Sequence, residues 1–255
     1  MSLYTCVPSG VEISATKFQI LSKLGSGVQG ETYVAQYDGQ VACAKVFKQE
    51  KEMVHEVMML TAAEPSSCSP KLYGICSSLR LLLMEMAPGV TLEERLKLRP
   101  CRVSVHRIMI ALGQAIENLH FAGIVHNDLK FDNIMVTIDD ATPHVTLIDF
   151  GWSTFKGDSP YPHISSEAVK SFPHVSPKLA FGGESDCGTD NYSYGIILQT
   201  VASVYKCPLF NVLSRMLTQQ GGIMQSLQSL LQYIRDDYCK NCLHTCPCDD
   251  CRRQH

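Results

Sequence analysis

The sequence lacks internal repeats, low-complexity linkers and a strong charge of either sign. Repeats at a fixed period would indicate a solenoid or a propeller, and a polar linker would separate domains, so neither organisation is expected. The formal net charge of −3 over 255 residues gives no electrostatic reason to expect a nucleic-acid or membrane-surface partner. A chain of this length can bury one sizeable core and leaves little for a further domain. The sequence does not indicate an oligomeric state.

Targeting signals are also missing. Residues 1–10 have neither the basic start nor the apolar core of a secretory signal. No uncharged apolar run reaches the length of a membrane span, and N-myristoylation has no acceptor because no glycine stands at the second position. We therefore expect an intracellular protein, cytoplasmic or nuclear, whose twelve cysteines are mostly reduced.

Two short polar motifs are the most informative feature present. Residues 126–133 read His-Asn-Asp-Leu-Lys-Phe-Asp-Asn, and Asp-Phe-Gly follows sixteen residues later at 149–151. Phosphoryl transfer with magnesium needs a group near the attacking hydroxyl and oxygen ligands for the metal, and Asp128, Asn133 and Asp149 can supply them. Either motif alone also fits an ordinary surface loop. Together they favour transfer of the terminal phosphoryl group of ATP.

A glycine-rich segment lies upstream. Gly25, Gly27 and Gly30 would let the backbone approach phosphate oxygens. A dinucleotide-binding fold shares this spacing, but there a helix opens at the third glycine. Here residues 32–37 continue as a β-rich segment, Asp-Gly at 38–39 predicts a hairpin turn, and residues 41–47 return as a strand.

Lys45 stands in the middle of this second apolar strand. An unpaired ammonium would be costly to bury there, so we expect an anionic partner, either phosphate oxygens or Glu56. Glu56 lies in residues 51–60, where apolar residues recur at helical spacing. A solvated helix face is the alternative reading of Glu56, and we favour the ion pair.

With these motifs in this order, the chain resembles the eukaryotic-type protein kinase family, in a divergent form, from about Leu21 to beyond Tyr205. The resemblance implies an α+β, two-lobed fold. The kinase domain would span residues 18–235, with a β-rich small lobe (18–86) and a mainly helical large lobe (87–235), followed by a cysteine-rich tail (236–255).

The resemblance also implies roles for single residues. Asp128 would be the catalytic base, Lys130 would steady the transferred phosphoryl group, and Asn133 with Asp149 would bind Mg²⁺. Asp190 would support the catalytic loop from a buried helix. Binding of ATP would involve Gly25, Gly27, Gly30, Thr32, Cys43, Lys45 paired with Glu56, Glu85, Ala87 and Met135.

The position of Lys130 is similar to the serine/threonine branch of the family. The function expected is therefore ATP- and Mg²⁺-dependent phosphorylation of Ser and Thr hydroxyls in a protein substrate. Two alternatives stay open: a pseudokinase-like nucleotide-binding scaffold, and a small-molecule or atypical kinase.

Four features depart from the family pattern. Asn127 stands where many members have an Arg that pairs with a phosphorylated activation segment, and Lys178 replaces the Glu of the Ala-Pro-Glu motif. Thr32 and Cys43 replace the usual Val and Ala above the adenine. Only ten residues separate Lys45 from Glu56, so the helix that carries Glu56 must be short or must start abruptly.

Local signals predict two helices of the large lobe. Thr91 is a candidate cap, with Glu94 three residues later, for a helix over 92–98, and residues 105–121 repeat apolar side chains at helical spacing. We expect His106 and His120 in this second helix to be surface or packing residues. Residues 151–177 are rich in Ser, Pro and Gly, which is typical of an activation and substrate loop, and no single hydroxyl there is singled out.

The tail carries five thiols and an imidazole within thirteen residues. Soft ligands at short spacing suit Zn²⁺, but the spacing is too compressed for two separated ligand pairs. Zinc binding and a disordered, oxidisable or lipid-modified tail both stay open. The candidate ligands are Cys239, Cys242, Cys246, Cys248 and Cys251.

Overall fold

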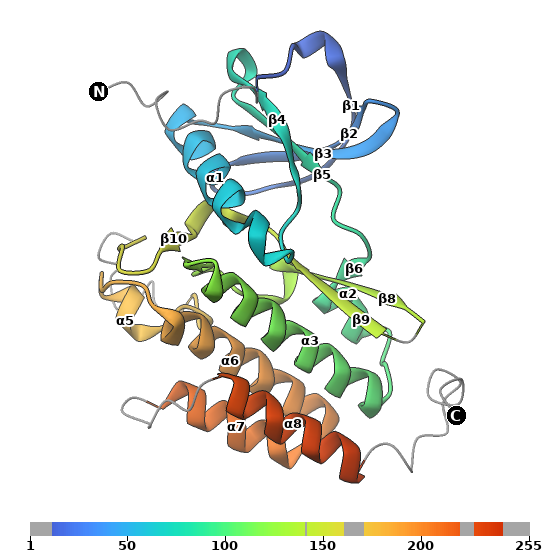
Figure 1. Ribbon diagram of the computed structural model, residues 1–255, viewed down its shortest axis with the longest axis vertical. Helices are drawn as coiled ribbons and strands as arrows, with labels where there is room; N and C mark the ends of the chain where they lie inside the picture. Colours follow the sequence, from blue (N-terminus) through green and yellow to red (C-terminus); the bar gives the residue numbers. More distant parts are fainter. Residues whose placement is uncertain (1–11, 141, 161–170, 220–226, 242–255) are drawn as a thin grey trace. The chain divides into compact units, whose positions relative to one another are not determined.

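The computed structural model describes residues 12–140, 142–160, 171–219 and 227–241, with only the backbone described for 238–241. The chain forms two compact units (Figure 1). The small unit contains the chain up to residue 87 together with residues 148–151. The large unit contains residues 88–147 and those from 152 onward.

The small unit is built on one antiparallel sheet of five strands in the order β1-β2-β3-β5-β4. The predicted turn at 38–39 joins β2 to β3, and both of its residues have positive φ (47° and 75°). This is the backbone that an Asp-Gly hairpin favours, because glycine adopts positive φ without strain. The strands are β1 (Phe18–Ser26), β2 (Gly30–Tyr37), β3 (Gln40–Phe47), β4 (Leu72–Cys76) and β5 (Leu81–Glu85).

One helix, α1 (Glu50–Ala63), follows β3 in the small unit (Figure 1). It is not short, since it has 14 residues, but it does start abruptly, three positions after β3 ends. The Gln49 N–H donates to Glu52 Oε2 at 3.2 Å and closes the first turn. Met53, Val57 and Leu60 are buried at helical spacing. Their burial anchors the helix that carries Glu56.

The large unit is mainly helical (Figure 1). Its long helices, α3 and α6, both bury many apolar residues. Helix α8 packs along α3 and buries Leu227, Leu230, Leu231 and Ile234. The helices are α2 (Leu92–Lys97), α3 (Arg102–Phe121), α5 (Pro177–Ala180), α6 (Cys187–Tyr205), α7 (Pro208–Thr218) and α8 (Leu227–Asn241).

Short strands complete the large unit. One sheet has the order β6-β8-β9 and the other pairs β10 with β7. The chain after residue 133 forms the antiparallel hairpin of β8 and β9. The strands are β6 (Val90–Thr91), β7 (Ile124–Val125), β8 (Ile134–Asp139), β9 (Thr142–Leu147) and β10 (Thr154–Phe155).

The predicted helix cap at Thr91 is confirmed. The Glu94 N–H donates to Thr91 Oγ1 at 3.1 Å, and the Thr91 N–H donates to Glu94 Oε2 at 3.0 Å. This reciprocal pair satisfies two helix-end donors. With a β-rich small unit and a helical large unit, the α+β fold class is also confirmed.

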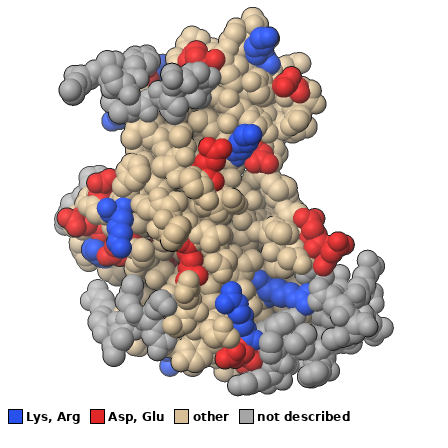
Figure 2. Space-filling model, viewed as in Figure 1, with Lys and Arg blue, Asp and Glu red and all other residues tan. Residues whose placement is uncertain are grey.

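Among the residues that the structure describes, no helix is both long and apolar enough to cross a bilayer. On the face seen in Figure 2, acidic and basic side chains lie close to one another in small groups.

Candidate active site

Lys45 is the centre of a charged cluster in the small unit. Its Nζ lies 2.6 Å from Glu56 Oε2 and 2.7 Å from Asp149 Oδ1. Strand β3 supplies the lysine and α1 the glutamate, and Asp149 belongs to the same unit through residues 148–151. The expected pairing of Lys45 with Glu56 is therefore present.

Lys45 and Glu56 are both buried, and their charges interact strongly for that reason. Glu56 is 1% exposed and Lys45 is 8% exposed. Burial alone would lower the pKa of Lys45, but the carboxylates of Glu56 and Asp149 raise it above its ordinary value. Lys45 thus stays charged, and the cluster presents a fixed cation beside a half-exposed carboxylate.

The glycine-rich segment lies between β1 and β2. A Cβ on Gly30 would lie 2.0 Å from the carbonyl oxygen of Val46, so this glycine is required by the approach of β3. A Cβ on Gly25 or on Gly27 would meet no described atom within 4 Å. Packing within the protein therefore does not explain these two glycines, whereas a ligand that approaches the backbone would.

Gln29 is a contact that sequence reasoning missed. Its Nε2 donates to the carbonyl oxygen of Gly151 at 2.9 Å, and both residues belong to the small unit. The bond ties the tip of the glycine-rich segment to the Asp-Phe-Gly motif. No local pattern indicates this bond, because its partners are 122 residues apart.

The expected adenine-binding residues fall in both units. In the small unit, Thr32 pairs with Lys45 across β2 and β3, and Cys43 pairs with Met84 across β3 and β5. Burial raises the pKa of the Cys43 thiol to about 11, so it remains protonated. Glu85 ends β5 and Ala87 ends the small unit, whereas Met135 lies in β8 of the large unit.

The loop after β7 gathers the predicted catalytic groups of the large unit. Lys130 Nζ and Asn133 Nδ2 donate to Asp128 Oδ2 at 2.7 and 2.9 Å. His174 Nε2 lies 2.9 Å from the other oxygen, Asp128 Oδ1. Burial alone would raise the pKa of Asp128, but the bonds from His174 and Lys130 lower it to about 2. Asp128 is thus held ionised.

His174 is a further residue that sequence reasoning missed. It lies outside both motifs, 46 positions beyond Asp128, and its carbonyl oxygen accepts a hydrogen bond from Ser193 Oγ at 2.6 Å. A lone histidine in a loop gives no sequence signal of this kind.

Asp190 supports the same loop from α6. It is completely buried and accepts from the backbone N–H groups of His126 and Asn127, each at 2.8 Å. His120 Nε2 lies 2.9 Å from it. Burial alone would lower the pKa of His120, but Asp190 raises it to about 9. This buried acid and its donors fix the backbone just before Asp128.

Asn127 fills the position where many family members have Arg. Its Nδ2 donates to the carbonyl oxygen of Trp152 at 3.1 Å and to Thr154 Oγ1 at 2.9 Å, and its Oδ1 accepts from Thr189 Oγ1 at 3.3 Å. A neutral amide therefore connects the loop to the segment after Asp-Phe-Gly and to α6.

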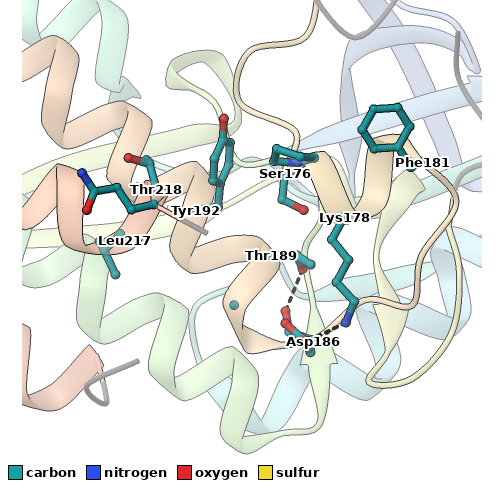
Figure 3. A pocket seen from close by; sticks show the side chains of 11 residues that line it. Ser176, Lys178, Phe181, Asp186, Thr189, Tyr192, Leu217 and Thr218 are labelled. Carbon is teal, nitrogen blue, oxygen red and sulfur yellow. Dashed lines mark hydrogen bonds and ion pairs between the residues drawn. The ribbon is translucent and has the colours of Figure 1, made fainter. Parts of the chain in front are cut away.

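Lys178, which stands where the family motif has Glu, forms an ion pair with an acid. Its Nζ lies 2.6 Å from Asp186 Oδ2, with both side chains partly exposed. Figure 3 shows the lysine pointing toward Asp186, beside the labelled Thr189. Ser176 caps α5 by accepting from the Leu179 N–H at 3.3 Å. This segment is thus held by a different ion pair from the one its family motif would make.

Parts of the sequence predictions lie outside the described residues. Of the segment 151–177, residues 161–170 are outside. Cys239 is described only as backbone in α8. The other candidate zinc ligands of the tail are also outside: Cys242, Cys246, Cys248 and Cys251.

Comparison with known proteins gives a family and several relatives. Residues 18–247 match the protein kinase domain. A probable serine/threonine-protein kinase of Dictyostelium discoideum is 28% identical over 205 residues, which cover 74% of this chain and 21% of the relative. One of Arabidopsis thaliana is 30% identical over 208 residues, covering 74% of this chain and 54% of the relative. One of Clostridium acetobutylicum is 34% identical over 133 residues, covering 51% and 20%.

The match extends over most of the chain, so the chain belongs to the protein kinase family. It spans about a fifth of the length of the Dictyostelium and Clostridium relatives.

Proposed function

We propose that the protein is an ATP- and Mg²⁺-dependent protein kinase that transfers the terminal phosphoryl group of ATP to Ser and Thr hydroxyls of a protein substrate. The observation that carries this proposal is the buried Lys45 held between Glu56 and Asp149. A cation fixed in this way suits nucleotide phosphates, and family membership supplies the reaction. The relatives are named as serine/threonine-protein kinases, which favours Ser and Thr as the phosphate acceptors.

Asp128 is the proposed catalytic base. A carboxylate whose pKa is held near 2 is a weak proton acceptor, so its first role would be to orient the attacking hydroxyl. Lys130 would then steady the transferred phosphoryl group, since it already lies beside Asp128. Proton transfer to Asp128 becomes favourable as the phosphoryl group leaves ATP.

Asn133 and Asp149 are the proposed magnesium ligands. The amide nitrogen of Asn133 is used in its bonds to Asp128, which leaves its oxygen for a cation. Asp149 bonds Lys45 through Oδ1, and its side chain is 39% exposed. Hard oxygen donors of this kind fit Mg²⁺, which would neutralise charge on the phosphates when bound.

The remaining expectations are proposals of the same kind. The kinase domain would comprise residues 18–235, divided into lobes 18–86 and 87–235, with a tail at 236–255. ATP would contact the expected residues of the small unit together with Met135. The protein would act in the cytoplasm or the nucleus, and tail cysteines would bind Zn²⁺ only if they lie close enough to share it.

One observation favours a second candidate, a nucleotide-binding scaffold. Both carboxylate oxygens of Asp128 already have hydrogen-bond partners. Lys130 and Asn133 donate to Oδ2, and His174 contacts Oδ1. A substrate hydroxyl must displace or join one of these donors. If a substrate never displaces His174 from Asp128, the protein binds nucleotide but transfers no phosphate.

Transfer of labelled phosphate from ATP tests the proposal. The purified chain is incubated with Mg²⁺ and a basic protein, and acid hydrolysis identifies the labelled amino acid. Asp149→Asn should abolish transfer, whereas Asp186→Asn, which changes a partly exposed acid paired with Lys178, should not. Folded wild-type protein that binds ATP without transferring phosphate would favour the scaffold. Label on tyrosine would refute the Ser/Thr assignment.

A further inference from the structure

Three side chains with metal-binding atoms meet in the large unit, away from the loop that carries Asp128. His106 comes from α3, Cys207 caps the start of α7, and Asp237 comes from α8. Their ligand atoms all lie within 4.8 Å of one another. His106 Nε2 is 3.2 Å from Asp237 Oδ2 and 3.9 Å from Cys207 Sγ.

The orientation of the His106 ring leaves one nitrogen for the cluster. Its Nδ1 lies 2.8 Å from the carbonyl oxygen of Arg102, which can only accept, so Nδ1 carries the proton. Nε2 then faces a carboxylate oxygen and a sulfur. A second proton or a metal ion must lie among these atoms, because bare lone pairs would repel one another. An Nδ1–H bonded to a carbonyl is also the outer contact that orients metal-binding histidines.

The spacing suits a tetrahedral ion. With Zn–S, Zn–N and Zn–O bonds of ordinary length, neighbouring ligands of a tetrahedral Zn²⁺ are about 3.4–3.6 Å apart. The two distances from His106 Nε2, 3.2 and 3.9 Å, therefore need changes of only a few tenths of an ångström. The Cys207 sulfur and the Asp237 carboxylate lie within 4.8 Å of each other and would move closer as both bind the ion. Phe210 packs against the His106 ring, with centroids 4.7 Å apart, and limits its rotation.

The burial and the charges of the three ligands suit a divalent ion. His106 and Cys207 are each 2% exposed, whereas the Asp237 side chain is 28% exposed. One thiolate, one carboxylate and a neutral imidazole together neutralise a divalent ion, which removes the cost of burying unpaired charge.

We propose that His106, Cys207 and Asp237 bind one Zn²⁺ ion, with the fourth position open to solvent on the Asp237 side. The ion connects α8 to α3 and to the start of α7. Its role is to stabilise the large unit, because the site shares no residue with the loop of Asp128. The site uses none of the residues proposed for ATP binding or phosphoryl transfer, so it is independent of the proposed kinase activity.

Cobalt binding tests this site, since Co²⁺ occupies zinc sites and absorbs light when a thiolate is bound to it. The protein used is the full chain in which the five tail cysteines are replaced by serine, so that tail thiols do not contribute. We expect one equivalent of Co²⁺ to bind with a thiolate-to-cobalt band, and Zn²⁺ to displace it. Zn²⁺ should also raise the thermal unfolding midpoint of this protein.

Three variants of that protein make the test specific. Cys207→Ser should remove the thiolate band. Asp237→Asn, at the most exposed ligand, should weaken cobalt binding by at least about tenfold. Removing a group that only contacts a metal ligand already weakens metal affinity by about that factor. Cys76→Ser removes an equally buried thiol in the small unit and should change nothing.

Several results would overturn the proposal. They are no cobalt band, a band that survives Cys207→Ser, unchanged affinity in Asp237→Asn, or a thermal midpoint that excess Zn²⁺ leaves unchanged. If Cys207→Ser fails to fold, the folded Asp237→Asn protein still decides the question through its cobalt affinity.

Discussion

Replacing Asp190 by Asn should strongly destabilise the large unit. The change keeps the size of the side chain and removes its charge. In the native structure the carboxylate accepts from two backbone N–H groups and lies 2.9 Å from His120 Nε2. Asparagine presents only one acceptor oxygen, and its NH₂ group would face a buried donor.

The size of the effect follows from burial. Asp190 is 0% exposed and the His120 side chain is 9% exposed. Breaking a buried ion pair by removing one partner costs about 3–5 kcal/mol, and each buried donor left without an acceptor costs about 1–3 kcal/mol. We therefore expect Asp190→Asn to lower the free energy of unfolding by about 3–5 kcal/mol.

The matched control is Asp186→Asn, the same substitution four residues earlier. Asp186 pairs with Lys178, and their side chains are 40% and 49% exposed. Exposed pairs contribute about 0–1 kcal/mol, so this variant should unfold nearly like the wild type. Urea titration followed by tryptophan fluorescence measures both variants, because the one tryptophan of the chain, Trp152, belongs to the large unit.

A clear result would refute this reasoning. If the two variants lost the same free energy, burial and the three donors of Asp190 would not determine its contribution. A loss below 1 kcal/mol in Asp190→Asn would mean that water or another acceptor replaces the carboxylate.

Three other predictions concern single side chains. Lys45→Met should reduce phosphate transfer at least about 100-fold, the cost of losing one positioned charge-stabilising donor, and a variant with normal turnover would exclude its proposed role. His174→Ala should raise kcat/KM for a protein substrate by about 2- to 10-fold, because it frees one oxygen of Asp128 from one hydrogen bond; an unchanged or lower value would show that this bond does not compete with substrate. In folded protein the pKa of His120 is raised from 6.5 to about 9, so its stabilising charge is fully present below pH 6.5 and is lost as pH rises through 9. The reference protein is His120→Gln, and both proteins carry Cys187→Ser so that this thiol, which has the opposite pH dependence, does not titrate. Because Cys187 also helps to raise the pKa of His120, the loss of stability should be at most about 3 kcal/mol; equal pH profiles would contradict it.

The parts of the fold that the sequence predicts correctly are those determined by residues close together in the chain. The turn at 38–39 and the cap at Thr91 each depend on residues only a few positions apart. Turn and cap preferences act over that range, so the pattern is visible in the sequence. The family motifs add the expected pairing of Lys45 with Glu56, although the sequence could not give the full length of α1.

Long-range partners explain what sequence analysis misses. Sequence analysis predicts surface or packing roles for His106 and His120, and the buried His106 fits a packing role. The sequence does not indicate that the two histidines lie next to acids 131 and 70 positions away. The contact of His174 with Asp128 is of the same kind. The two histidine–acid pairs form because helices pack together, and the contact of His174 with Asp128 forms because two loops meet. No short sequence pattern records which side chains then come into contact. The replacement partner of Lys178 also emerges only from the structure.

Asn127 shows how one departure from a family pattern can be accommodated by neighbouring groups. An Arg at this position carries a charge that needs an anion, such as a phosphorylated residue of the activation segment. The amide of Asn127 instead has neutral partners at Trp152, Thr154 and Thr189. These bonds form without a phosphate, and the neutral amide of Asn127 has no positive charge that could attract a phosphorylated residue. A phosphorylated residue of the activation segment is therefore not expected to control this chain through an ion pair at position 127.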